Sequence, residues 1–127
     1  MITLEAACPS GAEPVRARIE EVLAIVFAPR DRWPTLDEWR SLMPRWFVDE
    51  CSDDVRVQDC VIDKWSLRAW IYWFQPDQRR WTWAGAEASG ERLLMHVEPT
   101  GQGSLLLGTL EWLVQTAGGR LESRPPA

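Results

Sequence analysis

The chain has 127 residues, of which 46% are hydrophobic and 26% are charged. This balance is typical of one soluble globular domain, and it excludes collagen-like, coiled-coil and strongly disordered chains. Nine tryptophans, beside three phenylalanines and one tyrosine, supply ample apolar area for a core. The formal net charge of −5 disfavours nucleic acid and anionic membranes as partners.

The N-terminal residues, Met-Ile-Thr-Leu-Glu-Ala-Ala-Cys-Pro, lack the basic and apolar regions of a signal peptide. Apolar runs are too short for a membrane span. The three cysteines, Cys8, Cys51 and Cys60, are odd in number and irregularly spaced, which argues against a disulfide framework. We therefore expect a single cytoplasmic domain over residues 1–127, with residues 1–12 and 120–127 as the ends most open to fraying.

The first half of the chain carries several helix signals. Residues 1–12 are left unassigned, although Ile2 and Leu4 could supply a short strand. Apolar residues at helical spacing predict a helix from Pro14 to Pro29. Thr35-Leu-Asp-Glu38 has the form of a capping box and predicts a second helix. Pro44 should interrupt that helix and open a short helical turn to Cys51, and residues 52–64 should form a polar loop holding one short strand.

The second half predicts a mixed arrangement. Residues 65–74 fit a helix capped by Ser66, although their aromatic content also fits a buried strand. Residues 80–88 and 92–98 predict a β-hairpin across Ser89-Gly90, with Leu93, Met95 and Val97 facing the core. A last helix should be capped by Ser104 and end at Gly118-Gly119. The predicted fold class is α+β: several helices packed with a β-hairpin or small antiparallel sheet.

All of the formal net charge falls within residues 49–63, which we call the acidic segment. It holds six acidic residues and one base, Arg56, while the rest of the chain has 13 acidic and 13 basic residues. The acidic residues are Asp49, Glu50, Asp53, Asp54, Asp59 and Asp63. Such a block can steer a basic partner, but charge runs often form only a solvated loop. A calcium loop is disfavoured because Asp49–Asp54 lacks the glycine and final glutamate of an EF-hand.

Five tryptophans crowd into residues 65–83, near three arginines. Tryptophan and arginine are both enriched at binding hot spots, although a single tryptophan more often serves the core. Because a core of this size cannot easily satisfy nine indole N–H groups, we expect two to four partly exposed tryptophans. The candidate partner-binding residues outside the acidic segment are Trp73, Arg79, Arg80, Trp81 and Trp83.

The sequence contains none of the common catalytic motifs: it has no nucleophile elbow, phosphate loop, Cys-x-x-Cys or His-Glu-x-x-His. Its single histidine, His96, should lie on the outward face of a strand as a surface or hydrogen-bonded residue. Cys8, Cys51, Cys60 and His96 lack the short ligand pair of a zinc site. We expect no enzymatic activity, no metal and no cofactor.

In its second half, the chain contains Trp81-Thr-Trp83, then Gly108-Thr-Leu-Glu-Trp-Leu113, then Ala117-Gly118. These elements, which cover at most half of the chain, resemble small Trp-rich bacterial proteins with the character of immunity proteins of polymorphic toxin systems. The resemblance implies a small, cytosolic, non-catalytic protein that covers the active site of a toxin. It assigns no binding residue.

The charge pattern and the resemblance favour a non-catalytic protein-binding domain of the immunity or antitoxin type. Its partner would be a basic toxin, met by the acidic segment and by exposed tryptophans. One alternative is a structural or adaptor subunit of a larger bacterial assembly. Another is a small-ligand domain whose aromatic pocket joins Trp70, Trp73 or Trp81 to Arg68 or Arg79. A homodimer through the Trp-rich segment also stays open.

Overall fold

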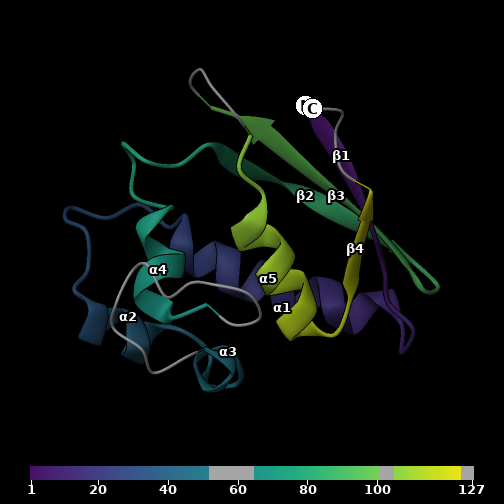
Figure 1. The fold of residues 1–127 in the computed structure, drawn as a ribbon, viewed down its shortest axis with the longest axis horizontal. Coiled ribbons are helices and arrows are strands. Elements are labelled where there is room, and N and C mark those ends of the chain that lie inside the picture. The colour runs from purple at the N-terminus through teal and green to yellow at the C-terminus, as the bar shows by residue number, and fades with distance from the viewer. Residues whose placement is uncertain (52–64, 101–104, 124–127) are drawn as a thin grey trace.

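The computed structural model describes residues 1–51, 65–100 and 105–123. Within them it shows an α+β domain with five helices and a four-stranded antiparallel sheet (Figure 1). The elements in chain order are β1 (Ile2–Ala7), α1 (Ala12–Val26), α2 (Leu36–Leu42), α3 (Arg45–Glu50), α4 (Leu67–Tyr72), β2 (Trp81–Ser89), β3 (Arg92–Pro99), α5 (Gly108–Ala117) and β4 (Arg120–Ser123). Helices α1 and α5 contact the sheet and each other, while α2, α3 and α4 gather on the side of α5 away from β4 (Figure 1).

The sheet has the strand order β2-β3-β1-β4. The predicted hairpin is confirmed: β2 and β3 pair around Gly90, whose φ of 60° is one that glycine adopts without strain. Leu93, Met95 and Val97 are fully buried, as expected from their alternation. The opposite face of β3 carries Arg92 and Glu98, both of which are exposed.

Both ends of the described chain pair in the sheet, where fraying was expected. Strand β1 lies between β3 and β4, with Leu4 opposite Met95 and Ala6 opposite both Leu93 and Leu121. Leu4 and Ala6 of this strand, and Cys8 directly after it, are at most 1% exposed, so alternate residues of this stretch reach the core. Two of these three side chains are small, which explains the weak apolar signal of residues 1–12. Strand β4 lies within 120–127, and residues 124–127 lie outside the described residues.

The helix predictions for the first half are confirmed. Helix α1 buries its periodic apolar face, and α3 begins directly after Pro44, which is its N-cap. Helix α2 begins with a complete capping box: the Thr35 hydroxyl accepts from the Glu38 N–H, and the Glu38 carboxylate accepts from the Thr35 N–H. The predicted loop over residues 52–64 lies outside the described residues.

In the second half, residues 67–72 form the helix α4, whose N-cap Ser66 accepts a hydrogen bond from the Ala69 N–H at 3.1 Å. Helix α5 begins later than predicted. Its N-cap is Leu107, without a side-chain cap bond, while Ser104 lies outside the described residues. Its end is as predicted, because Gly118 adopts the left-handed conformation at φ 110°.

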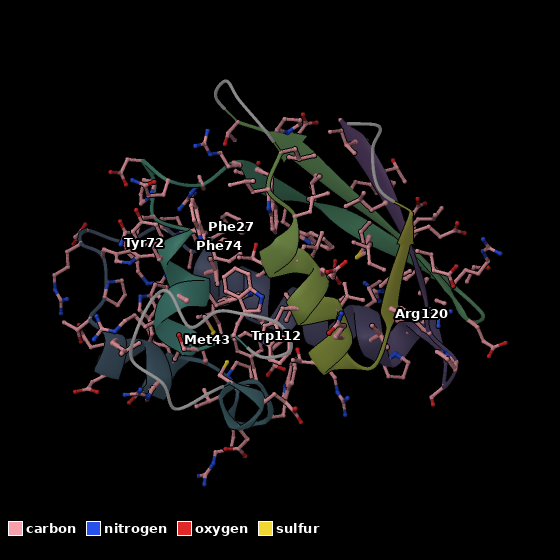
Figure 2. The ribbon with its side chains drawn as sticks, viewed as in Figure 1. Phe27, Met43, Tyr72, Phe74, Trp112 and Arg120 are labelled. Atoms are coloured by element: carbon pink, nitrogen blue, oxygen red, sulfur yellow. The ribbon has the colours of Figure 1, made fainter. Side chains whose placement is uncertain are left out.

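Six rings form a continuous aromatic cluster that joins the end of α1, α3, α4 and β2. They are Phe27, Trp46, Phe47, Trp70, Phe74 and Trp81. Neighbouring ring centroids lie 4.5 to 5.9 Å apart, in tilted or edge-to-face arrangements that favour the ring quadrupoles. Phe27 and Phe74 lie side by side between α1 and α4 (Figure 2). The cluster therefore fixes α4 against the first helix and the sheet.

The stability of the fold depends on pH through the Glu38 carboxylate in the capping box of α2. The Arg32 guanidinium, and next the Thr35 N–H, lower the pKa of Glu38 from its usual 4.5 to about 2. The ionised carboxylate therefore stabilises the fold fully above pH 4.5, and this contribution is lost as the pH falls through about 2. We expect Glu38→Gln to lower the urea midpoint at pH 6 and to flatten its decline between pH 5 and 2. Asp37→Asn on the same helix is the control, and equal pH profiles for Glu38→Gln and the unmodified chain would refute this role.

Candidate functional site

The solvent exposure of the nine tryptophans does not follow their clustering in the sequence. Five are half-buried: Trp33, Trp46, Trp65, Trp73 and Trp83. This is one more than the largest number expected. Trp70 and Trp81, both from the Trp-rich stretch, lie in the core at 0% and 3% exposure. They face inward because Trp70 shares the buried face of α4 with Leu67 and Ile71, and because Trp81 occupies an inward position of β2. Trp81 is therefore not an exposed anchor.

Two of the half-buried tryptophans open into an apolar hollow of about 440 Å³, which we call the leucine hollow. It lies between the two ends of α4 and the chain that leads into α5. Its lining consists of Trp65, Trp73, Leu105, Leu106, Leu107, Gly108 and Thr109. Leu106 is 41% exposed, one of few large apolar side chains in the described residues with so much surface in water. Among the described residues, no charged side chain lines this hollow.

The backbone of the leucine hollow is held from the core by two indoles. Trp81 Nε1 donates to the Leu106 carbonyl at 3.1 Å, and Trp70 Nε1 donates to the Thr109 carbonyl at 2.9 Å. A Cβ at Gly108 would lie 3.3 Å from Trp65 Cζ2, so the missing side chain lets this indole lie close to the α5 terminus. These hydrogen bonds hold the backbone of Leu106 and Thr109 against the core.

The acidic segment lies close in the sequence to Trp65, which lines the leucine hollow. Its first residues, Asp49 and Glu50, are exposed at the end of α3, where Asp49 pairs with Arg45 at 3.5 Å. Asp53, Asp54, Asp59 and Asp63 lie outside the described residues. In the sequence, Asp63 precedes Trp65 by two residues. In the sequence, the most acidic stretch is thus separated only by Lys64 from a residue that lines the leucine hollow.

The remaining predicted site residues do not line the leucine hollow. Arg79 donates through Nε and Nη2 to the Phe74 carbonyl and stacks over the Phe27 ring at 5.1 Å. Burial lowers the pKa of Arg79, and these contacts give it a structural role at the end of α4. Arg80 is half-buried, and Trp83 packs against the core from β2. Only Trp73, among the five predicted residues outside the acidic segment, lines the leucine hollow.

Sequence reasoning missed the leucines of the site. A helix capped by Ser104 would have included Leu105, Leu106 and Leu107, but α5 begins only at Gly108. The available signal was the run Leu105-Leu106-Leu107, since three consecutive apolar residues cannot all face one side of a helix. Trp73 was among the candidate residues, whereas Trp65 was not.

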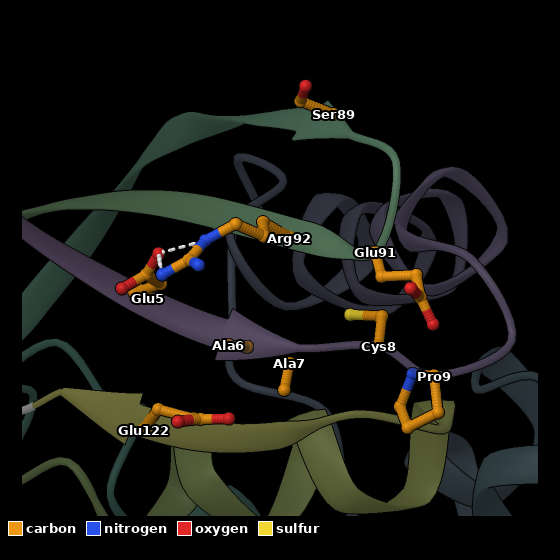
Figure 3. Close-up of a pocket in the computed structure, with 9 residues that line it drawn as sticks. All are labelled: Glu5, Ala6, Ala7, Cys8, Pro9, Ser89, Glu91, Arg92 and Glu122. Atoms are coloured by element: carbon orange, nitrogen blue, oxygen red, sulfur yellow. Dashed lines mark hydrogen bonds and ion pairs between the residues drawn. The ribbon is translucent and has the colours of Figure 1, made fainter.

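The polar face of the sheet offers no comparable site. Figure 3 shows an open hollow of about 570 Å³, where Arg92 of β3 is ion-paired with Glu5 of β1 and Glu122 lies on the neighbouring β4. Cys8 also lines it, but the residue is fully buried and burial raises the pKa of its thiol, which disfavours the reactive thiolate.

His96 is hydrogen-bonded on the outward face, as predicted. Its Nδ1 lies 2.9 Å from Thr3 Oγ1 and its Nε2 lies 3.0 Å from Glu87 Oε2, so the three side chains form a row across β1, β3 and β2. None of the three lines the neighbouring hollow. A hydroxyl on this open face has no enclosed position for a substrate beside it, so we assign no catalytic role to the row.

The aromatic pocket considered from the sequence is not formed as expected. Trp70 and Trp81 are in the core. Arg79 donates a hydrogen bond to the Phe74 carbonyl, and Arg68 lines a different hollow of about 210 Å³. Among the described residues, no group of three or more His, Cys, Asp or Glu is placed to hold a metal ion. Nor does the described part of the chain contain a helix with the length and apolar character to cross a membrane.

The indole bonds predict unequal effects of one chemical change. Trp70 Nε1 has an acceptor, whereas Trp112 Nε1 is buried without a partner in the described part of the chain. Trp70→Phe loses a hydrogen bond, while Trp112→Phe removes a buried N–H that was already unsatisfied. We expect Trp70→Phe to lower the free energy of unfolding by about 1 kcal/mol more than Trp112→Phe. Urea unfolding measures the difference, and an equal or larger loss for Trp112→Phe would contradict the role given to the Trp70 bond.

Comparisons with protein-family models, curated proteins and solved structures give no match for this chain.

Proposed function

We propose that this chain is a non-catalytic protein-binding domain of the immunity type, which neutralises a basic protein by covering its working surface. The observation that carries the proposal is the position of the leucine hollow. Trp65, which lines this partly exposed apolar surface, follows in the sequence two residues after the segment that holds the whole net charge. In this proposal, apolar and electrostatic recognition act together.

The apolar part of this surface has the composition of a binding hot spot. Tryptophan is enriched among the residues that dominate interface energies, and Trp65 and Trp73 each keep part of their surface in water. Covering such surface is favourable by about 25 cal/mol for each Å² removed from water. Because the indoles of Trp70 and Trp81 already fix the backbone, little ordering cost opposes binding.

The acidic segment would raise the association rate and would select for basic partners. A local block of negative charge attracts basic proteins at long range and repels acidic ones. An immunity protein must find its toxin before the toxin finds a substrate, so a fast association rate has direct value. Nucleic acid is a poor competitor for this surface, because its phosphates carry the same sign of charge.

The acidic segment is tested by the kinetics of association. The tagged chain is used to recover its partner from the native host, and the association rate constant is then measured between 50 and 500 mM salt, a range of about 14 to 4 Å in screening length. We expect the rate to fall steeply with salt, and Asp53→Asn with Asp54→Asn to lower it and weaken its salt dependence.

The control is Asp31→Asn with Asp77→Asn, which changes the net charge equally at two exposed acids outside the acidic segment. A rate insensitive to salt, or an equal effect of both pairs, would remove the acidic segment from the proposal. If binding then still required the leucine hollow, the chain would fit an adaptor subunit better than an immunity protein. Neutralisation is tested by growth: we expect a host that makes the partner to grow only when this chain is co-expressed.

A further inference from the structure

We infer that the hollow of about 210 Å³ between α2 and α4 binds a small aromatic carboxylate, whose charge pairs with Arg68 and whose ring lies among aromatic side chains. We call this site the Arg68 hollow. It shares no lining residue with the leucine hollow, so it is a second site and does not depend on the proposed function.

Each of the two helices contributes one face to the Arg68 hollow. Arg68, Ile71 and Tyr72 occur at spacings of three and four residues on α4, so they lie on the same side of that helix. Leu36 and Trp39 are likewise three residues apart on α2, which contacts α4 (Figure 1). Helical spacing therefore brings a cation, a phenol and apolar walls to one place.

Arg68 is the group that would recognise the carboxylate. Every other arginine of the described residues has an interaction with another part of the chain, whereas Arg68 has no hydrogen bond or ion pair there. For example, Arg92 is paired with Glu5, and Arg32 is paired with Glu38. Arg68 is also the one charged side chain among the residues that line its hollow. An unpaired guanidinium can bind a carboxylate through two parallel N–H donors.

The other polar side chains of the Arg68 hollow also have unused hydrogen-bonding capacity. Tyr72 and Gln75 make no side-chain hydrogen bond within the described residues, and Trp39 Nε1 is buried there without a partner. Trp112 Nε1 is unpaired too, but Trp112 lines neither this hollow nor the leucine hollow. A buried donor without an acceptor is costly and calls for an explanation. The Arg68 hollow is thus rich in donors and poor in acceptors, which favours an anionic ligand.

The size and walls of the Arg68 hollow favour one flat ring. A cavity of about 150 Å³ is enough to hold benzene, so about 210 Å³ leaves room for a ring with one carboxylate. Trp33 and Tyr72 are half-buried, and they offer aromatic surface beside the apolar Leu36 and Ile71. An anion without a ring would leave these walls in water.

The test measures the binding of benzoate to the full chain by nuclear magnetic resonance of the indole N–H groups. We expect the Trp33 and Trp39 signals to shift with a dissociation constant of about 1 mM, as suits a ligand of this size, while Trp46 and Trp65 stay in place. Benzamide has the same shape without the charge, and it should bind at least about tenfold more weakly. Cyclohexanecarboxylate and acetate keep the charge without the flat ring, and they should also bind more weakly.

Arg68→Gln is the matched change in the site, because this exposed side chain has no partner to lose in the described part of the chain. It should weaken benzoate about tenfold and leave benzamide nearly unchanged. Arg45→Gln is the control, since it removes the same charge from an exposed arginine of α3 that does not line the Arg68 hollow.

The inference would be overturned if benzoate in large excess did not shift the Trp33 and Trp39 signals. Equal binding of benzoate and benzamide, equal binding of benzoate and either of the other two acids, or equal effects of the two glutamine variants would overturn it as well. None of these results would bear on the proposed protein-binding function, because the two hollows have no lining residue in common.

Discussion

An indole N–H that is taken out of water needs an acceptor, and in this protein that requirement joins the core to the surface. Trp70 and Trp81 belong to the aromatic cluster, and both send their N–H groups to backbone carbonyls of the segment before and within the first turn of α5. The packing of the rings therefore determines where the backbone of Leu105–Leu107 lies. If the cluster shifts, the wall of the leucine hollow shifts with it.

This coupling explains how a small domain can keep apolar side chains in water. The cost of exposing Leu106 is offset by the burial of the rings beneath it, whose edge-to-face contacts each add about 0.5–1.5 kcal/mol. A surface held in this way loses little conformational freedom on binding, so contact with a partner mainly lowers the dissociation rate. In the proposed function, the acidic segment would raise the association rate, because long-range charge speeds the encounter. The leucine hollow and the acidic segment would then act on different rate constants of the same association.

Sequence reasoning was strongest where a local rule decides the structure. The capping box at Thr35 and Glu38, the break at Pro44, the Ser66 cap and the stop at Gly118 each depend on residues within a few positions, and all four are confirmed. It was weakest where the answer depends on distant partners. Strand β1 lies inside the sheet because β3 and β4 pair with its two edges. Its small residues Ala6 and Ala7 gave little indication in the sequence of a buried strand.

The candidate site was predicted only in part, for a related reason. Trp73 was singled out and does line the leucine hollow, whereas Trp81 was expected at the surface and supports that hollow from beneath. Composition and clustering cannot separate these two roles, since both are tryptophans near arginines. The difference arises from strand alternation at β2 and from the late start of α5, which leaves three leucines outside a helix.

The most direct measurement is a photo-cross-linking comparison within the complex. A photoreactive amino acid is placed at position 106 in one variant and at position 94 in another, two leucine positions of similar exposure on different elements. If the leucine hollow is the binding surface, irradiation joins the partner to position 106 and not to position 94. Cross-linking from position 94 alone, or equally from both, would show that the partner binds elsewhere.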